Sequence, residues 1–286
     1  MPAVSPPIWL TARFRIELSR PQVMGIVNVT PDSFSDGGAW LDPTLALAHC
    51  ESLLKQGADL LDIGGESTRP GARAPAPEEE MARVLPVLRG AVTLGVPISV
   101  DTSCPELMRA ALDLGADIVN DVRSLQRPGA LDTVAAHPQA GLCLMHWRGE
   151  PGSMQQRPDL GFDAGDIVAT VGDFLAGRLT AVRARGISAE RVLLDPGIGF
   201  GKTVAQNFEL LRRQPELLRL GRPLLIGWSR KSSLGAVTGR AVGERSAASV
   251  AAALAAVQQG ASVLRVHDVQ ATVDALAVWR AAGLPA

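Results

Sequence analysis

A short apolar segment followed by a stretch rich in Ala, Leu, Glu and Arg occurs eight times along this chain. The apolar segments have the length and composition of buried strands, and the stretches between them space their leucines as amphipathic helices do. Strand and helix alternating eight times over roughly 250 residues predict a (β/α)8 barrel, with a doubly wound open sheet as the alternative. We expect the strands at Val23–Val29, Asp59–Gly65, Pro97–Thr102, Asp117–Val122, Gly141–His146, Arg191–Gly197, Pro223–Ser229 and Val263–Asp268.

The length of 286 residues is compatible with one domain, because α/β barrels often reach this size. No linker, low-complexity tract or block of like charges divides the chain. We therefore expect a single TIM-barrel domain over residues 1–286, with a core at about 23–282. Trp9–Leu18 is expected to form a short N-terminal β-hairpin that closes the bottom of the barrel.

The charge balance and the cysteines exclude several classes of protein. The 28 basic and 29 acidic side chains leave a net charge of -1, without the basic excess that nucleic acid or anionic lipid would require. The three cysteines are widely spaced and form no CxxC pair, so neither a disulfide framework nor a zinc site is indicated. There is no signal-like leader and no run of about 18 apolar residues. We expect a cytoplasmic protein that binds neither nucleic acid nor membrane.

Polar residues end all eight predicted strands. In a barrel, the carboxyl ends of the strands carry the functional groups. Asn and Asp are poor strand residues, so the whole set indicates a bound ligand, although Asp117, Asn120 or Asp121 alone could cap the next helix. The residues at these ends are Asn28, Asp62, Glu66–Arg69, Asp101, Asn120, Asp121, His146, Asp195, Ser229–Lys231, Arg265, His267 and Asp268.

Three of these features indicate the chemistry of the ligand. The string DPGIGFGKT at 195–203 has Pro196 where a phosphate-binding P-loop needs glycine, so its glycines are interpreted as a tight turn beside a ligand. Arg265 and His267 lie two apart, on one face of the last strand, and suit an anion. Asp101 and Asp195 would both point into the mouth, where a heterocycle with N–H donors would satisfy them. The residues alone therefore indicate a transferase or isomerase that binds an anion and a heterocycle.

Eight strings of the sequence resemble, in order, the motifs of the bacterial dihydropteroate synthases, the pterin-binding enzymes of folate biosynthesis that sulfonamides inhibit. The resemblance runs from about Met24 to Val269. The strings are MGIVNVTPDSFSDGG, GADLLDIGGESTRPGA, ISVDTS, GADIVNDV, LMHWRGEPGSMQ, LLDPGIGFGK, SRKS and RVHDV.

The resemblance implies a transferase that joins 6-hydroxymethyl-7,8-dihydropterin diphosphate to 4-aminobenzoate with Mg2+, giving 7,8-dihydropteroate and diphosphate. It also implies a homodimer. The family's pterin contacts fall on Asp101, Asn120, Asp195, Lys231, Met145, Phe200 and Gly227. Its diphosphate contacts fall on Arg265, His267 and Asn28, with Asn28 also a magnesium ligand and Asp36 a second one. Its 4-aminobenzoate contacts fall on Phe34, Thr68, Arg69, Pro70 and Ser229.

Two other functions remain open at this point. One is methyl transfer from a folate to a corrinoid protein, which would share the pocket of Asp101, Asn120 and Asp195. The other is a homologue that binds pterin without catalysis. The departures from the family pattern are Cys104, Trp147 and Trp228. The loop Pro31–Gly38 is expected to close over bound ligand, and Arg265→Ala is expected to lower turnover while free-pterin binding survives.

Overall fold

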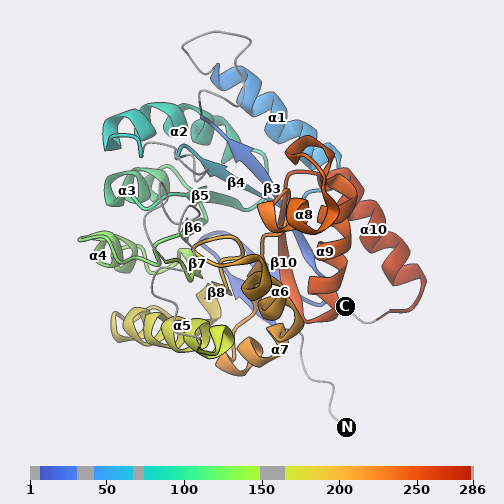
Figure 1. Ribbon diagram of the computed structural model, residues 1–286. Coiled ribbons are helices and arrows are strands. Elements are labelled where there is room, and N and C mark those ends of the chain that lie inside the picture. Colours follow the sequence, from blue (N-terminus) through green and yellow to red (C-terminus); the bar gives the residue numbers. More distant parts are fainter. Residues whose placement is uncertain (1–6, 31–41, 67–73, 149–164, 285–286) are drawn as a thin grey trace.

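Eight parallel strands close into a barrel in the computed structural model, which describes residues 7–30, 42–66, 74–148 and 165–284. Helices surround the strands (Figure 1). Strand β10 pairs with both β3 and β9, so the barrel is confirmed and the open sheet is excluded. The strands are β3 (Gln22–Asn28), β4 (Leu60–Gly64), β5 (Ile98–Asp101), β6 (Ile118–Asp121), β7 (Gly141–Met145), β8 (Val192–Asp195), β9 (Leu224–Ile226) and β10 (Ala261–Val266).

All eight predicted strands exist, but most are shorter than the sequence indicates. The predicted strand Pro223–Ser229 is reduced to Leu224–Ile226, and the last strand ends at Val266. The polar residues expected at the strand ends therefore lie partly in the loops that follow. His267 stands just beyond β10, so it does not share a strand face with Arg265 as the spacing predicted.

Three of the described helices begin with a residue whose side chain accepts hydrogen bonds from the first backbone N–H groups. Asp42 caps the first helix by accepting from the N–H of Thr44, and Thr203 forms a capping box with Gln206. None of the helices in the described ranges is long and apolar enough to cross a membrane. The helices are α1 (Pro43–Lys55), α2 (Pro77–Ala91), α3 (Pro105–Asp113), α4 (Ala130–Ala135), α5 (Ile167–Ala184), α6 (Val204–Arg212), α7 (Gln214–Leu217), α8 (Ser232–Thr238), α9 (Ser246–Gln258) and α10 (Val269–Ala281).

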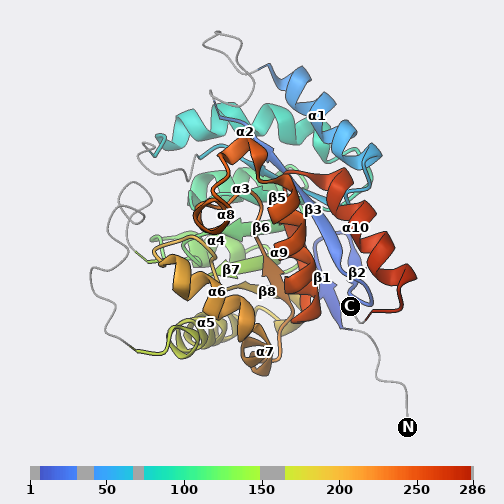
Figure 2. The same ribbon diagram turned by 45° about the vertical axis from the view of Figure 1, so that its right-hand side comes forward.

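The predicted N-terminal hairpin is confirmed as β1 (Ile8–Leu10) paired antiparallel with β2 (Arg15–Glu17), seen in Figure 2. Trp9 of this hairpin is wholly buried, and its indole N–H donates to the carbonyl of Arg191 at 2.9 Å. Trp9 packs in one apolar cluster with Met24, Leu60, Ile118, Cys143, Leu193, Leu225 and Val263 from seven of the barrel strands. This cluster fills the lower barrel, which leaves the carboxyl ends of the strands for polar side chains.

Asp117 fixes the hairpin to the barrel instead of capping a helix. It is wholly buried and accepts hydrogen bonds from the backbone N–H of Ile98 and from the backbone and guanidinium of Arg13. We expect Asp117→Ala to destabilise the protein by about 3–5 kcal/mol, because it leaves these donors unpaired. Turnover per folded molecule should not change. Urea unfolding measures the loss of stability. The exposed control Arg212→Ala should lose less than about 1 kcal/mol, and equal losses for the two variants would contradict the prediction.

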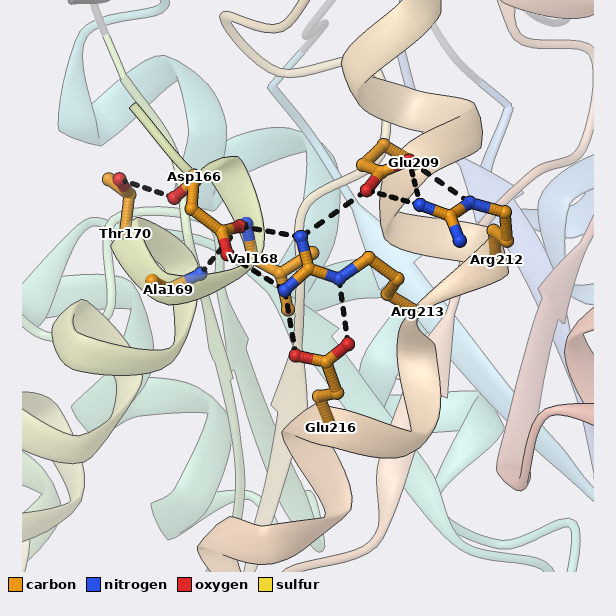
Figure 3. Close-up of polar contacts among 8 residues, drawn as sticks. All are labelled: Asp166, Val168, Ala169, Thr170, Glu209, Arg212, Arg213 and Glu216. Atoms are coloured by element: carbon orange, nitrogen blue, oxygen red, sulfur yellow. Dashed lines mark hydrogen bonds and ion pairs between the residues drawn. The ribbon is translucent and has the colours of Figure 1, made fainter. Parts of the chain in front are cut away.

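Arg213 joins three helices of the outer layer (Figure 3). Its guanidinium pairs with Asp166, the N-cap of α5, at 2.7 Å, with Glu216 of α7 at 2.7 Å and with Glu209 of α6 at 3.3 Å. These contacts tie α5, which precedes β8, to α6 and α7, which follow β8.

Candidate active site

A guanidinium held between two carboxylates lies at the carboxyl ends of three barrel strands. Arg265 of β10 donates from Nε to Asp62 Oδ2 and from Nη2 to Asp101 Oδ2, each at 2.6 Å. Asn120 of β6 donates from Nδ2 to the same Asp62 oxygen at 3.0 Å. Asp62 is wholly buried, and its other oxygen has no hydrogen-bond partner among the described residues. Asp62 is therefore the common acceptor that orients Arg265 and Asn120.

This cluster has one fixed cation and one carboxyl group that titrates near neutral pH. Burial lowers the pKa of Arg265, but the carboxylates of Asp62 and Asp101 raise it above its ordinary value. Burial raises the pKa of Asp101 to about 7, with the Arg265 charge opposing the rise and the Asp62 charge adding to it. Asp101 can therefore accept a hydrogen bond or donate one near neutral pH.

The opposite side of the mouth carries Asp195 and Lys231. Asp195 ends β8, and its Oδ1 accepts from the N–H of Gly197 at 2.7 Å. Lys231 follows β9, and its Nζ lies 4.0 Å from the ring centroid of Phe200, a cation–π contact. Burial raises the pKa of Asp195 and lowers that of Lys231 to about 8, where the Asp195 charge opposes the lowering. Asp195 and Lys231 thus offer hydrogen-bond acceptors and donors to a ligand at this part of the mouth.

His267 and Ser229 form a hydrogen-bonded pair beside the cluster. Ser229 Oγ lies 2.9 Å from His267 Nδ1 and accepts from the backbone N–H of His267 at 3.1 Å. Burial and the Arg265 charge lower the pKa of His267 to about 3, so its imidazole is neutral at physiological pH. An anion here would meet ring N–H donation from His267 and positive charge from Arg265.

The tight turn expected after Asp195 is confirmed. Gly197 and Gly201 have φ angles of 69° and 62°, and a Cβ on either would lie within 2.3 Å of a carbonyl oxygen of the segment after β7. Lys202, at the end of this turn, donates to three backbone carbonyls. Sequence reasoning missed Lys202, although a lysine directly after a glycine turn was the available signal.

The comparisons with known proteins agree with this geometry. A family model described as "Pterin binding enzyme" matches residues 24–267. The dihydropteroate synthase of Neisseria meningitidis serogroup B is 52% identical over 283 residues, which cover 97% of this chain and 98% of that relative. The chain belongs to the dihydropteroate synthase family.

Two solved dihydropteroate synthases have the same fold. The Xanthomonas albilineans enzyme with 4-aminobenzoic acid superposes with a TM-score of 0.89 at 51% identity, covering 97% of this chain and 98% of that one. The Burkholderia cenocepacia enzyme complexed with 7,8-dihydropteroate gives a TM-score of 0.87 at 48% identity, covering 97% of each chain. These matches favour the synthase over the corrinoid methyltransferase considered from the sequence.

The remaining residues expected from the dihydropteroate synthase motifs divide into two groups. Asn28 is half-buried at the end of β3, Met145 is buried at the end of β7, and Gly227 directly follows β9. Within the described ranges there is no group of three or more His, Cys, Asp or Glu residues arranged to hold a metal. Phe34, Asp36, Thr68, Arg69 and Pro70, and with them the loop Pro31–Gly38, lie outside the described residues.

Three polar residues at strand ends do not take part in this site. His146 packs its ring edge-on against Phe174 of α5, with centroids 5.0 Å apart. Asp121 accepts from the N–H groups of Arg123 and Leu125 and from the hydroxyl of Ser103, so it stabilises its own turn. It does not cap the next helix, which begins after Gly129. Asp268 pairs with Arg230 at 2.7 Å.

The departures from the family pattern pack into the structure. Trp228 is buried and lies 5.1 Å from the ring of Phe208 on α6. The ring of Trp147 lies 5.5 Å from the guanidinium of Arg123, which also forms a buried ion pair with Glu66 at 3.1 Å. Cys104 is buried, and burial raises the pKa of its thiol to about 11.

Glu80 of α2 gives the protein a pH-dependent stability. It is 2% exposed, and burial, reinforced by the Glu66 carboxylate, raises its pKa to about 7 from an ordinary value of 4.5. The folded state therefore binds the proton more tightly, and stability falls as the pH rises from 4.5 to 7. Glu80→Gln should stabilise the protein by about 3 kcal/mol at pH 8 and change little at pH 4.5. Urea unfolding at pH 8 and at pH 4.5 measures the change in stability, with the exposed Glu78→Gln as control. Equal effects of Glu80→Gln at the two pH values would contradict the prediction.

Proposed function

We propose that this chain catalyses the condensation of 6-hydroxymethyl-7,8-dihydropterin diphosphate with 4-aminobenzoate, giving 7,8-dihydropteroate and diphosphate in folate biosynthesis. The observation that carries the proposal is the pair of carboxyl groups at the barrel mouth, the partly buried Asp101 and the buried Asp195, together with the cations Arg265 and Lys231. Family membership supports the same reaction.

The pterin ring suits the polar groups of the mouth. A 2-amino-4-oxopyrimidine offers adjacent N–H donors, which the carboxylate of Asp195 accepts, while Lys231 donates to the carbonyl or a ring nitrogen. The side-chain amide of Asn120 carries both donors and an acceptor. One of its N–H groups donates to Asp62, which fixes the orientation of the amide. Met145, Phe200 and Gly227 would line the ring.

The diphosphate would lie against Arg265 and His267, with Asn28 beside them. Because His267 is neutral, it would donate a hydrogen bond from its ring without adding positive charge. Mg2+ is commonly held in proteins by one or two side-chain oxygens together with substrate phosphates. A single amide oxygen, that of Asn28, fits an ion that arrives with the diphosphate, and Asp36 is proposed as a second ligand. When bound, the ion would supply positive charge for the leaving diphosphate.

The side chains of the mouth favour catalysis by positioning and electrostatic stabilisation over general-base catalysis. The carbon–oxygen bond to diphosphate breaks, the methylene carbon keeps a positive charge delocalised into the pterin, and the arylamine nitrogen then forms the new bond and loses a proton to solvent. A pKa of about 3 makes His267 a weak base at neutral pH. Asp195 and Lys231 hold the ring while charge develops on it.

The 4-aminobenzoate would approach from the side of Ser229, with Phe34, Thr68, Arg69 and Pro70 completing its site. Ser229 is held by His267, which links this site to the proposed diphosphate site. We also propose that sulfonamides inhibit this protein and that it assembles as a homodimer.

A diphosphate-release assay tests the function directly. With both substrates and Mg2+ we expect stoichiometric formation of diphosphate and 7,8-dihydropteroate, and loss of the reaction on chelation of Mg2+. Methyl transfer from methyltetrahydrofolate to a corrinoid protein, or pterin binding without turnover, would each refute the proposal. Rescue of a strain that lacks its own synthase gives an independent check.

A further inference from the structure

Lys202 places an ammonium group inside the protein without a carboxylate within salt-bridge distance among the described residues. The side chain is 6% exposed and belongs to the loop at residues 196–203 between β8 and α6. Its Nζ donates to the carbonyl oxygens of Gly197 at 2.8 Å, Phe200 at 3.1 Å and His146 at 3.3 Å. Three acceptors match the three N–H donors of a protonated lysine.

These three carbonyls fix the loop to the segment after β7. His146 directly follows β7, whereas Gly197 and Phe200 belong to the loop itself. A Cβ on Gly197 would lie 1.8 Å from the His146 oxygen, so the two backbones pack too closely for any other residue. Carbonyl oxygens turned toward one point repel each other unless a cation or donor lies between them. The ammonium of Lys202 therefore stabilises the closed turn.

The loop that Lys202 holds carries one wall of the candidate site. The Phe200 ring lies 4.0 Å from Lys231 Nζ, and a Cβ on Gly199 would lie 3.0 Å from Lys231 Cδ. Asp195 stands at the other end of the loop and is joined to it by the N–H of Gly197. A displacement of this loop would move Phe200 and Lys231 relative to Asp195.

We propose that Lys202 is a positioning residue for pterin recognition: its ammonium holds the loop in the conformation that sets Phe200 and Lys231 against the pterin ring. Lys202 itself does not touch the substrate. This inference rests on the proposed function.

The proton on Lys202 makes the positioning sensitive to pH. Burial lowers the pKa of Lys202 to about 7, with the Asp195 charge opposing this and the Lys231 charge adding to it. A neutral amine has two N–H donors, so above this pH one of the three carbonyls loses its partner. The titratable and charged groups around Lys202 are Asp195, Lys231, His146 and Arg148.

Lys202→Met tests the inference, because Met keeps the length of the side chain and removes its donors. Isothermal titration with 6-hydroxymethylpterin should show an affinity about tenfold lower, whereas the KM for 4-aminobenzoate should change less than about twofold. Lys202→Gln keeps an amide donor, so its pterin affinity should lie between that of the unchanged protein and that of Lys202→Met. The exposed Lys55→Met serves as the matched control and should bind pterin as the unchanged protein does.

The pH profile separates positioning from a merely structural role. Pterin affinity of the unchanged protein should fall between pH 6 and 8, and the ratio of its affinity to that of Lys202→Met should shrink over this range. If Lys202→Met proves unstable, the same comparison is made with Lys202→Gln. Unchanged pterin affinity, equal losses for both substrates, or a constant ratio would each overturn the inference. Failure of the unchanged protein to bind pterin would refute the proposed function and the inference together, whereas binding unaffected by Lys202→Met would refute the inference alone.

Discussion

Arg265→Ala should lower turnover roughly a thousandfold, as removal of a donor to a developing anion does in other enzymes, and should also destabilise the protein by about 3–5 kcal/mol. The loss of stability follows because the wholly buried Asp62 and the partly buried Asp101 would remain without their cation. Free pterin should bind more weakly as well, since Asp62 also orients Asn120. The motif alone predicted that free-pterin binding would survive, and the contacts of Arg265 revise that expectation.

The pH dependence of this variant identifies the cause. Without Arg265 the pKa of Asp101 rises further, and protonation of Asp101 relieves its repulsion with Asp62. The destabilisation should therefore be larger at pH 8 than at pH 5.5, as measured by urea unfolding. The double variant Arg265→Met with Asp62→Asn removes the charge imbalance and should recover stability without recovering turnover. Full pterin affinity in Arg265→Ala would show that Arg265 serves the diphosphate alone.

The sequence predicts the barrel because burial on both faces of a parallel sheet imposes a regular alternation of apolar strands and amphipathic helices. The same logic predicts which end of the barrel is polar, since Asp101, Asn120 and Asp195 interrupt segments that would otherwise be apolar. Strand ends are less predictable: β10 ends before His267, because the chain turns there into α10. The pattern of apolar and polar residues in the sequence is the same whether a polar residue at a strand end belongs to the strand or to the loop.

The partners of these polar side chains could not be predicted in the same way. Arg265, Asp62 and Asp101 come from β10, β4 and β5, and their contacts depend on the stagger of strands around the barrel. No local spacing encodes that stagger. Asp62 was therefore placed at a strand end but not recognised as the residue that holds Arg265. Lys202 was missed for another reason: its place after the glycine turn marks the residue, but its acceptors are backbone carbonyls, which the sequence does not identify.

Asp195→Asn should reduce pterin affinity roughly a thousandfold while the stability changes by less than about 1 kcal/mol. The N–H of Gly197 fixes Oδ1 of Asp195 and uses one of its acceptor sites, so both carboxylate oxygens can still accept from the pterin. An amide in this place replaces an acceptor by a donor, which would then face the N–H donors of the ring. The exposed Asp173→Asn on α5 is the matched control and should bind pterin normally.

The pH profile of binding gives a second signature for Asp195. Burial raises the pKa of Asp195, and only its ionised form accepts two hydrogen bonds from the pterin. Pterin affinity of the unchanged protein should therefore fall as the pH is lowered through this raised pKa, and that part of the profile should be absent from Asp195→Asn. Isothermal titration of 6-hydroxymethylpterin across the acidic range measures both curves. Parallel curves for the two proteins would mean that the titrating carboxyl is Asp101, on the opposite side of the mouth, and that Asp195 recognises the ring through shape alone.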